Sequence, residues 1–180
     1  MRIATGINQV EYSVLAGPAF TVFFVISMLF TGMLTDRLNR KVMLSVAIIG
    51  WSISTGLHCF ANSFGTLLAA RLGVGLFQSA ATPPAFSLMD DYFPIERRTT
   101  ANSIYVFGYG LGSGMSIITP VVIGAIGWRL AFVAIGSLGV FIGLVCLFTI
   151  KEPERFRFYR GKSIKFVGNS AYLSDKPLFK

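Results

Sequence analysis

The sequence predicts an all-α integral membrane protein with five membrane-spanning helices. Of its 180 residues, 53% are apolar and 13% are charged, and the mean hydropathy is +0.66. Soluble domains carry about 25% charged residues, so the natural solvent for this chain is lipid. The charges that it carries gather in short connectors between long apolar runs. Each run is close to the length of about 20 residues that crosses the hydrocarbon core.

The first two spans are expected over residues 12–35 and 42–61. The connector Gly32–Lys41 has the sequence GMLTDRLNRK, and it is so short that the two spans must form a tight hairpin with its turn at the membrane surface. Within this connector, Gly32 would let a neighbouring backbone come close. Asp36 can accept hydrogen bonds from backbone N–H groups or pair with a cation.

The other three spans are expected over residues 65–89, 101–123 and 130–150. Pro83-Pro84 should kink the third span, because proline lacks the N–H of a helical hydrogen bond and clashes with the preceding turn. Trp128 precedes the fifth span and suits a membrane interface.

The positive charges predict the orientation of the chain. The connector around Asp36, the loop over residues 90–98 and the segment 151–180 contain three, two and eight Lys and Arg residues. The opposite side holds only Arg2 and Arg129. Because cationic loops stay in the cytoplasm, the Asp36 loop and the C-terminal tail are both expected to be cytoplasmic.

The chain divides into a helical domain over residues 1–155 and a basic cytoplasmic linker or tail over residues 156–180. Cations alternate with aromatic residues from Arg155 to Lys162, and each cation would contribute about 1 kcal/mol towards anionic lipid. The rest of the tail is polar and is expected to be loosely ordered. The net charge of +8 does not indicate nucleic-acid binding, because the basic segment emerges directly from a membrane helix.

The connector resembles the loop signature of the major facilitator superfamily of secondary transporters. The shared pattern is G-x-x-x-D-R-x-N-R-K, which in that family lies between the second and third helices. Further resemblances follow in the same order over Arg71–Gly75, Asp91–Ser103 and Gly127–Arg155. The resemblance implies helices two to six of the N-terminal half, with the first helix missing.

Within the superfamily, the chain is most similar to spinster-like transporters, which are associated with sphingolipid and lysolipid export. The similarity lies in Leu15–Phe20, Asp36–Lys41 and Arg71–Gly75. These relatives commonly carry a glutamate seven residues after the helix-four arginine, where this chain has Gln78. A glutamine cannot exchange a proton, but it can hydrogen-bond a substrate headgroup.

The resemblance implies secondary transport of a small organic or lipid-like solute by alternating access, and not an enzyme. The alternative is a non-transporting membrane subunit or truncated pseudo-transporter with a structural role. The expected partners are the lipid bilayer, a small-molecule or lipid substrate, and the missing helices or a larger membrane assembly. No nucleophile–base pair or metal-ligand cluster is apparent in the sequence, so no cofactor or metal is expected.

Arg71 is the only Lys, Arg, Asp or Glu residue well inside a predicted span. A charge there costs about 2.5–3.5 kcal/mol on insertion scales, so it should face the protein interior or a wet cavity. Arg71 would bind an anionic substrate group or a coupling carboxylate. Alternatively, it would pair structurally with a neighbouring helix or extend outward to the membrane surface. Three polar residues near the proline kink are further candidates for substrate contacts: Gln78, Ser79 and Thr82.

Two further groups of residues have expected roles. The cytoplasmic gating loop comprises Gly32, Asp36, Arg37, Arg40 and Lys41, with an Asp36–Arg40 pair expected to act as a latch. Acidic residues of the 90–98 loop would pair with Arg97 or Arg98, unless these loops are simply solvated.

Glycines four residues apart permit close packing of helices in lipid or line a mobile gate. These are Gly108, Gly110, Gly112 and Gly114.

Overall fold

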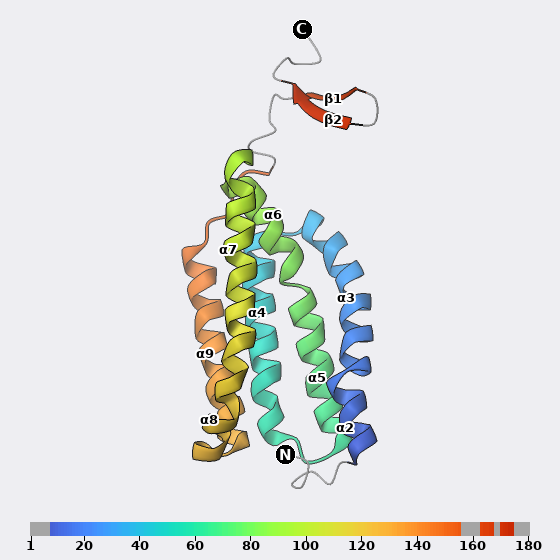
Figure 1. Ribbon diagram of the computed structural model, residues 1–180, viewed down its shortest axis with the longest axis vertical. Coiled ribbons are helices and arrows are strands. Elements are labelled where there is room, and N and C mark those ends of the chain that lie inside the picture. Colours follow the sequence, from blue (N-terminus) through green and yellow to red (C-terminus); the bar gives the residue numbers. More distant parts are fainter. Residues whose placement is uncertain (1–7, 156–162, 168–169, 175–180) are drawn as a thin grey trace.

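The computed structural model describes residues 8–155, 163–167 and 170–174, which form a bundle of antiparallel helices and a small hairpin (Figure 1). The predicted all-α fold class is confirmed. The helices are α2 Gln9–Ala16, α3 Pro18–Arg37, α4 Arg40–Leu57, α5 Phe64–Ser79, α6 Thr82–Tyr92, α7 Ile95–Gly114, α8 Thr119–Ile126 and α9 Trp128–Thr149, with 3-10 turns η1 His58–Phe60 and η2 Met115–Ile118.

Among the residues that the structure describes, four helical stretches are long and apolar enough to cross a membrane. They are Gln9–Arg37, Arg40–Phe60, Ile95–Ile126 and Trp128–Thr149. The remaining expected span, 65–89, consists of α5 and α6, which have 16 and 11 residues. Neither of these helices reaches the length of about 20 residues that crosses the core, but together they do.

The break between α5 and α6 is the kink expected from Pro83-Pro84. Helix α5 ends at Ser79, and α6 begins at Thr82 with a proline in its first turn. Pro83 has no N–H to donate to the carbonyl of Ser79, four residues earlier. Instead, the hydroxyl of Thr31 donates to that carbonyl at 3.3 Å. A side chain of α3 therefore supplies a hydrogen bond that the proline removed.

Residues are distributed between surface and interior as lipid requires. Large apolar side chains lie outside: Ile117 is 80% exposed and Phe148 is 82% exposed. The buried positions are mostly small or polar, and they include Ser27, Thr31, Thr35, Ser45 and Ser52. Helices in lipid associate through small residues and polar contacts and not through a large apolar core.

Helices α4 and α9 pack closely because α9 presents glycines to α4 (Figure 1). A Cβ built on Gly136 would lie 2.8 Å from the carbonyl oxygen of Ser52, and one on Gly143 would lie 2.5 Å from a side-chain carbon of Ile49. A Cβ on Gly139 would overlap the side chain of Ser52. Any larger residue at these positions would push the two helices apart.

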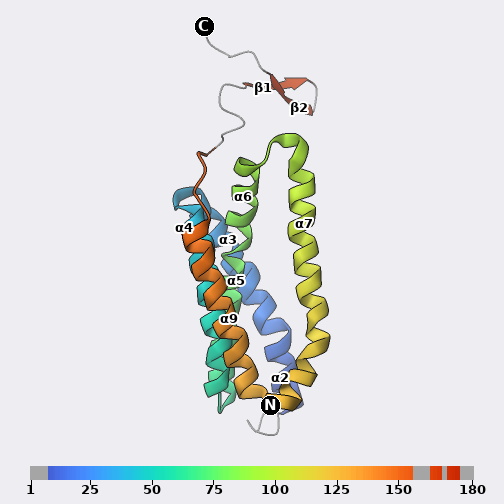
Figure 2. The same ribbon diagram turned by 90° about the vertical axis from the view of Figure 1, so that its left-hand side faces the viewer.

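Helix α7 lies on the opposite side of the molecule from α4 and α9 (Figure 2). No residue of α7 is buried, and a Cβ added at any of its four glycines would meet nothing within 4 Å. The glycine face therefore packs against nothing in the described part of the chain. The expected packing role of Gly108, Gly110, Gly112 and Gly114 stays a prediction.

The tail contains one element that differs from the expected loosely ordered segment. Strands β1 Ser163–Val167 and β2 Ser170–Ser174 pair antiparallel, with Ser163 opposite Ser174. The expectation of a loosely ordered segment was wrong for these ten positions. The signal was present in the sequence, because Gly-Asn between two short runs is typical of a hairpin. The rest of the predicted tail, residues 156–162, 168–169 and 175–180, lies outside the described residues.

Candidate functional site

Arg40 is the centre of a buried charge cluster at one end of the bundle. It is the first residue of α4, directly after Asn39, whose side chain accepts a hydrogen bond from the backbone N–H of Val42 at 3.0 Å. This N-cap starts the helix after a connector of only two residues, Leu38 and Asn39. The side chain of Arg40 is only 2% exposed, so its charge must be balanced within the protein.

All three guanidinium nitrogens of Arg40 donate hydrogen bonds. Nη1 lies 2.5 Å from Asp91 Oδ2, and Nε lies 2.9 Å from Glu152 Oε1. Nη1 also donates to the carbonyl and the hydroxyl of Ser87, at 3.1 and 3.0 Å, and Nη2 donates to the carbonyl of Pro153 at 3.2 Å. We call Arg40, Ser87, Asp91, Glu152 and Pro153 the Arg40 cluster. It joins the start of α4, the end of α6 and the segment after α9.

Glu152 holds the segment after α9 against the start of α4. Its second oxygen accepts a hydrogen bond from the backbone N–H of Lys41 at 2.8 Å. Burial alone would raise the pKa of this carboxyl. The hydrogen bonds from Arg40 and Lys41 and the positive charge of Arg40 outweigh burial, so the pKa of Glu152 is lowered below its usual value. Glu152 is therefore ionised at neutral pH.

Arg155 makes a second tie at this end of the bundle. Its guanidinium donates to the carbonyls of Thr35 and Leu38, at 2.9 and 2.7 Å, and to the carbonyl of Asp36. These carbonyls belong to the last turn and C-cap of α3. Carbonyls at the end of a helix have no backbone N–H of the same helix to accept from. A cation there also interacts favourably with the negative end of the helix.

The structure pairs Arg40 differently from the sequence-based expectation, whereas Arg98 pairs with an acidic residue of its own loop as expected. Arg40 does not pair with Asp36, whose residue is exposed and contacts Arg155 through its backbone carbonyl. Asp91 pairs with Arg40, and Asp90 lies 3.7 Å from Arg98. Asp36 lies in the last turn of α3 and Arg40 begins α4, so the two residues do not share one helix face.

The other members of the predicted gating loop lie around the Arg40 cluster. Arg37 is exposed in the last turn of α3, and Lys41 is half-buried in the first turn of α4. A Cβ at Gly32 would meet nothing within 4 Å, so no close backbone approach occurs there within the described residues.

Arg71 lies in α5, half-buried, with the centre of its guanidinium 5.3 Å from the ring centroid of Phe20. This is a cation–π distance. No carboxylate lies within ion-pair distance of Arg71 in the described part of the chain. A contact with a coupling carboxylate, part of the expected functional role, is therefore not formed within these residues. The contact with Phe20 of α3 is a structural pairing with a neighbouring helix, which was the alternative role.

The three polar candidates near the break differ in accessibility. Gln78 and Thr82 are half-buried, at the end of α5 and the start of α6. Ser79 is fully buried, and its hydroxyl donates to the carbonyl of Leu76 at 2.7 Å. Gln78 and Thr82 therefore have accessible surface for a solute, whereas Ser79 satisfies the end of its own helix. No group of three His, Cys, Asp or Glu residues suited to a metal occurs among the described residues.

The sequence matches the Major Facilitator Superfamily over residues 3–178. This chain belongs to that superfamily. It is 26% identical to the D-galactonate transporter of Escherichia coli over 86% of this chain and 37% of the relative. It is 31% identical to the sphingosine-1-phosphate transporter SPNS2 of Danio rerio over 78% of this chain and 29% of the relative.

The fold is similar to that of a bacterial homolog of the human lysosomal transporter Spinster, in an inward-facing and occupied conformation. The TM-score is 0.73 and the identity is 30%, over 84% of this chain and 38% of that structure. The resemblance to the superfamily and to its spinster-like members is confirmed. The chain is a multi-pass integral membrane protein whose relatives are transporters and not enzymes. It spans less than two fifths of the length of the relatives named here.

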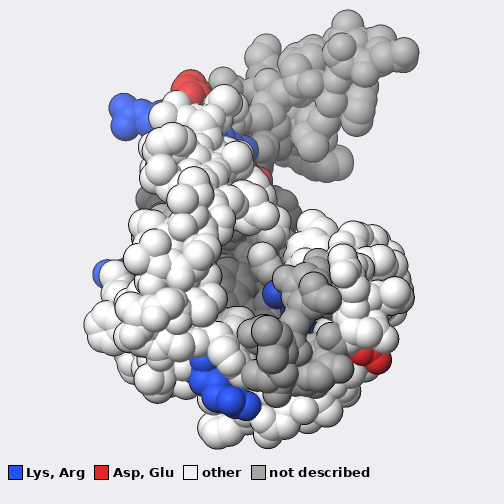
Figure 3. Space-filling model, turned by 60° about the horizontal axis from the view of Figure 1, so that its bottom comes forward, with Lys and Arg blue, Asp and Glu red and all other residues white. Residues whose placement is uncertain are grey.

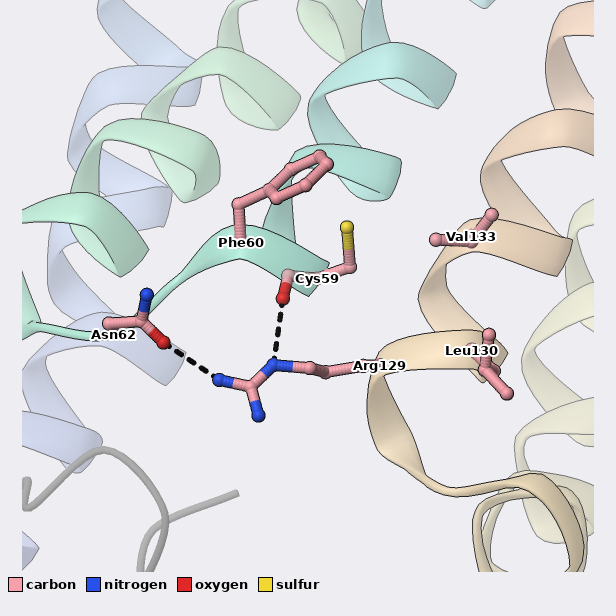
Figure 4. Close-up of a pocket in the computed structure, with 6 residues that line it drawn as sticks. All are labelled: Cys59, Phe60, Asn62, Arg129, Leu130 and Val133. Atoms are coloured by element: carbon pink, nitrogen blue, oxygen red, sulfur yellow. Dashed lines mark hydrogen bonds between the residues drawn. The ribbon is translucent and has the colours of Figure 1, made fainter.

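At the end of this major facilitator chain opposite the Arg40 cluster, most of the described residues are uncharged (Figure 3). There, Arg129 donates from Nε to the carbonyl of Cys59 at 2.9 Å and from Nη2 to the side-chain oxygen of Asn62 at 2.7 Å (Figure 4). Its guanidinium also lies 4.5 Å from the Trp128 ring centroid. The sequence pattern does not single out Arg129, because an arginine beside an interfacial tryptophan is common at the ends of spans.

His58 has a structural environment near the same end. Its residue is buried, its Nδ1 lies 2.9 Å from the carbonyl oxygen of Ser54, and its ring stacks on that of Phe132 at 5.0 Å. These contacts join η1 to α9.

Proposed function

We propose that this chain is part of a secondary transporter that moves a small organic or lipid-like anion by alternating access. The observation that carries the proposal is Arg71, a guanidinium inside an apolar span with no carboxylate paired to it in the described residues. A charge at that depth is costly unless it meets an opposite charge or a wet cavity. A solute anion would satisfy it.

The break between α5 and α6 supports the same location. Secondary transporters bind their substrates near the midplane of the bilayer, at discontinuous helices. Arg71 lies eight residues before the end of α5 at Ser79, about 12 Å along the helix. Gln78 and Thr82 flank the break and would hydrogen-bond the polar part of the solute.

The relatives support an anionic substrate. D-galactonate is a carboxylate and sphingosine-1-phosphate is a lipid phosphate. Arginine binds both groups through two parallel hydrogen bonds. Because Gln78 carries no proton to exchange, the proposal assigns it a hydrogen bond to the solute and no part in proton coupling.

We further propose that the Arg40 end is cytoplasmic and that its loop faces the other half of the transporter. Seven of the described Lys and Arg residues lie at that end, and Arg129 lies at the other. Cationic loops favour the cytoplasm. Asp36 and Arg37 are exposed and so accessible to a partner helix. Arg40 is buried beneath them and fixes the loop through its ion pair with Asp91. The glycine face of α7 would pack against a helix that this chain does not supply.

The test compares Arg71→Ala, Arg71→Lys and Arg97→Ala in proteoliposomes of the longest protein that the reading frame encodes. Arg97 is an exposed arginine outside the proposed site. Loss of a charge-assisted hydrogen bond of about 1.5–3 kcal/mol should lower uptake of an anion such as D-galactonate at least tenfold in Arg71→Ala. Arg71→Lys should retain part of it, and Arg97→Ala should match the unaltered protein.

Two results would count against transport by this site. One is unchanged uptake in Arg71→Ala at equal membrane content. The other is a chain that transports nothing yet copurifies in fixed ratio with a larger assembly, which would favour the structural subunit instead.

A further inference from the structure

A groove runs along the outer surface between α4 and α9. It consists of two adjoining recesses of about 430 Å³ each, which share Cys59, Phe60 and Val133. Along α4 it extends from Ser52 to the following η1 turn, and along α9 it extends from Arg129 to Val140.

The groove is hollow because its floor is made of small residues. Gly56 and Gly136 lie where the two helices come closest, with a Cβ on Gly136 only 3.0 Å from the Cα of Gly56. The rims are large and apolar: Ile53 and Leu57 are each 50% exposed, and Phe60 is 73% exposed. Both helices are membrane spans, so an apolar occupant must fill the groove at this depth.

The length of the groove matches one leaflet of a bilayer. Helix α9 has 22 residues, about 33 Å at 1.5 Å per residue, close to the hydrocarbon thickness of about 30 Å. Trp128 starts this helix and is suited to the headgroup region. From Arg129 to Val140 the groove then extends about 17 Å inwards, which is close to half of the hydrocarbon core.

The charge at its mouth matches a phosphate. Arg129 is held in place by Cys59 and Asn62 through its Nε and Nη2 atoms, and its residue remains exposed. Figure 4 shows the guanidinium extending from α9 towards Cys59 and Asn62, with the apolar side chains of Leu130 and Val133 on the α9 side of the recess. Guanidinium groups have five N–H donors, so donors remain for an anion.

We propose that this groove binds one acyl chain of a phospholipid from the leaflet remote from the Arg40 cluster, with the lipid phosphate on Arg129. A partner helix would require an apolar face along the full span, whereas the groove is limited to one leaflet and ends in a fixed cation at headgroup depth. This lipid site does not depend on the proposed transport function.

The experiment measures binding of phosphatidylglycerol to the purified chain by native mass spectrometry from detergent micelles. Arg129→Gln removes the cation, and Arg129→Lys retains it. Ser137→Phe places a ring in the groove from an exposed position that lines it, without altering the glycines that touch α4. Arg97→Gln is the matched control, an exposed arginine at the other end of the bundle.

Arg129→Gln and Ser137→Phe should each weaken the tightest phosphatidylglycerol binding about tenfold or more, with Arg129→Lys in between and Arg97→Gln unchanged. Helical content by circular dichroism should be equal in all variants. The proposal is overturned if neither variant weakens binding, or if only one does, because both phosphate and acyl chain are required. It is also overturned if the groove residues crosslink between two copies of the chain, since a second copy would then be the occupant.

Discussion

Arg40→Met tests the buried charge cluster directly. The substitution keeps a long side chain but leaves Asp91 without its partner at 2.5 Å, and Asp91 is only 6% exposed. Removing one partner of a buried ion pair costs about 3–5 kcal/mol. Glu152 is 25% exposed and can recover water, so we expect a loss near the lower end, about 3 kcal/mol. Unfolding in mixed detergent micelles, followed by circular dichroism, measures it.

A control variant and a double variant test whether the loss of stability comes from the pairing of Arg40 with Asp91. Arg37→Met removes an exposed arginine three residues away and should change stability by less than about 0.5 kcal/mol. Arg40→Met with Asp91→Leu removes both partners and should recover most of the loss, because an apolar pair can replace a buried ion pair at little cost. Equal effects of Arg40→Met and Arg37→Met, or additive effects in the double variant, would refute a coupled buried pair.

Two further predictions concern the same packed region. The pKa of Glu152 is lowered in the folded chain, so its contribution is present above its unfolded pKa of about 4.3 and disappears as the pH falls through the lowered folded value. Glu152→Gln should therefore cost about 1–2 kcal/mol at pH 7 and converge with the unaltered chain in acid; a constant difference between pH 7 and pH 3 would contradict this. Gly139→Leu should destabilise the chain by at least about 1–3 kcal/mol through overlap with Ser52, whereas Gly112→Leu should change it by less than about 0.5 kcal/mol. Thermal unfolding of the two variants side by side distinguishes them, and equal losses would be the contrary result.

The fold class could be predicted from the sequence because lipid imposes one strong rule. Every backbone polar group must be satisfied within the chain, so long apolar runs without charges become helices. The break at Pro83-Pro84 followed from the covalent structure of proline. The carbonyl partner supplied by Thr31 could not be foreseen, because it depends on how α3 lies against α5.

The partners of Arg40 show where sequence proximity fails. Asp36 lies four residues before Arg40, the spacing at which charges pair on one helix. The connector at Leu38 and Asn39 separates two helices, so that rule does not apply across it. The actual partners lie 51 and 112 positions away along the chain. They meet Arg40 only because the start of α4 and the C-terminal ends of α6 and α9 lie at the same end of the bundle.

The glycines show a different limit. Gly108 and Gly112 have the same spacing of four as Gly139 and Gly143. Only the second pair touches another helix of the described chain. The spacing of glycines indicates that another helix can pack closely there, but it does not indicate which helix does so. A sequence that contains two such stripes therefore cannot assign them without the three-dimensional arrangement.

The packed and unpacked parts of the bundle together indicate how the chain would move. Helices α4 and α9 are held face to face by glycines. Helix α6 follows a break in its span and leads into α7, of which no residue is buried. Among the described residues, Asp91 and Ser87 join the end of α6 to Arg40 on α4, and Tyr92 joins it to Lys151 after α9. Any rotation of α6 and α7 about the break would have to open these contacts. Opening the buried Arg40–Asp91 pair would therefore add to the free-energy cost of such a rotation.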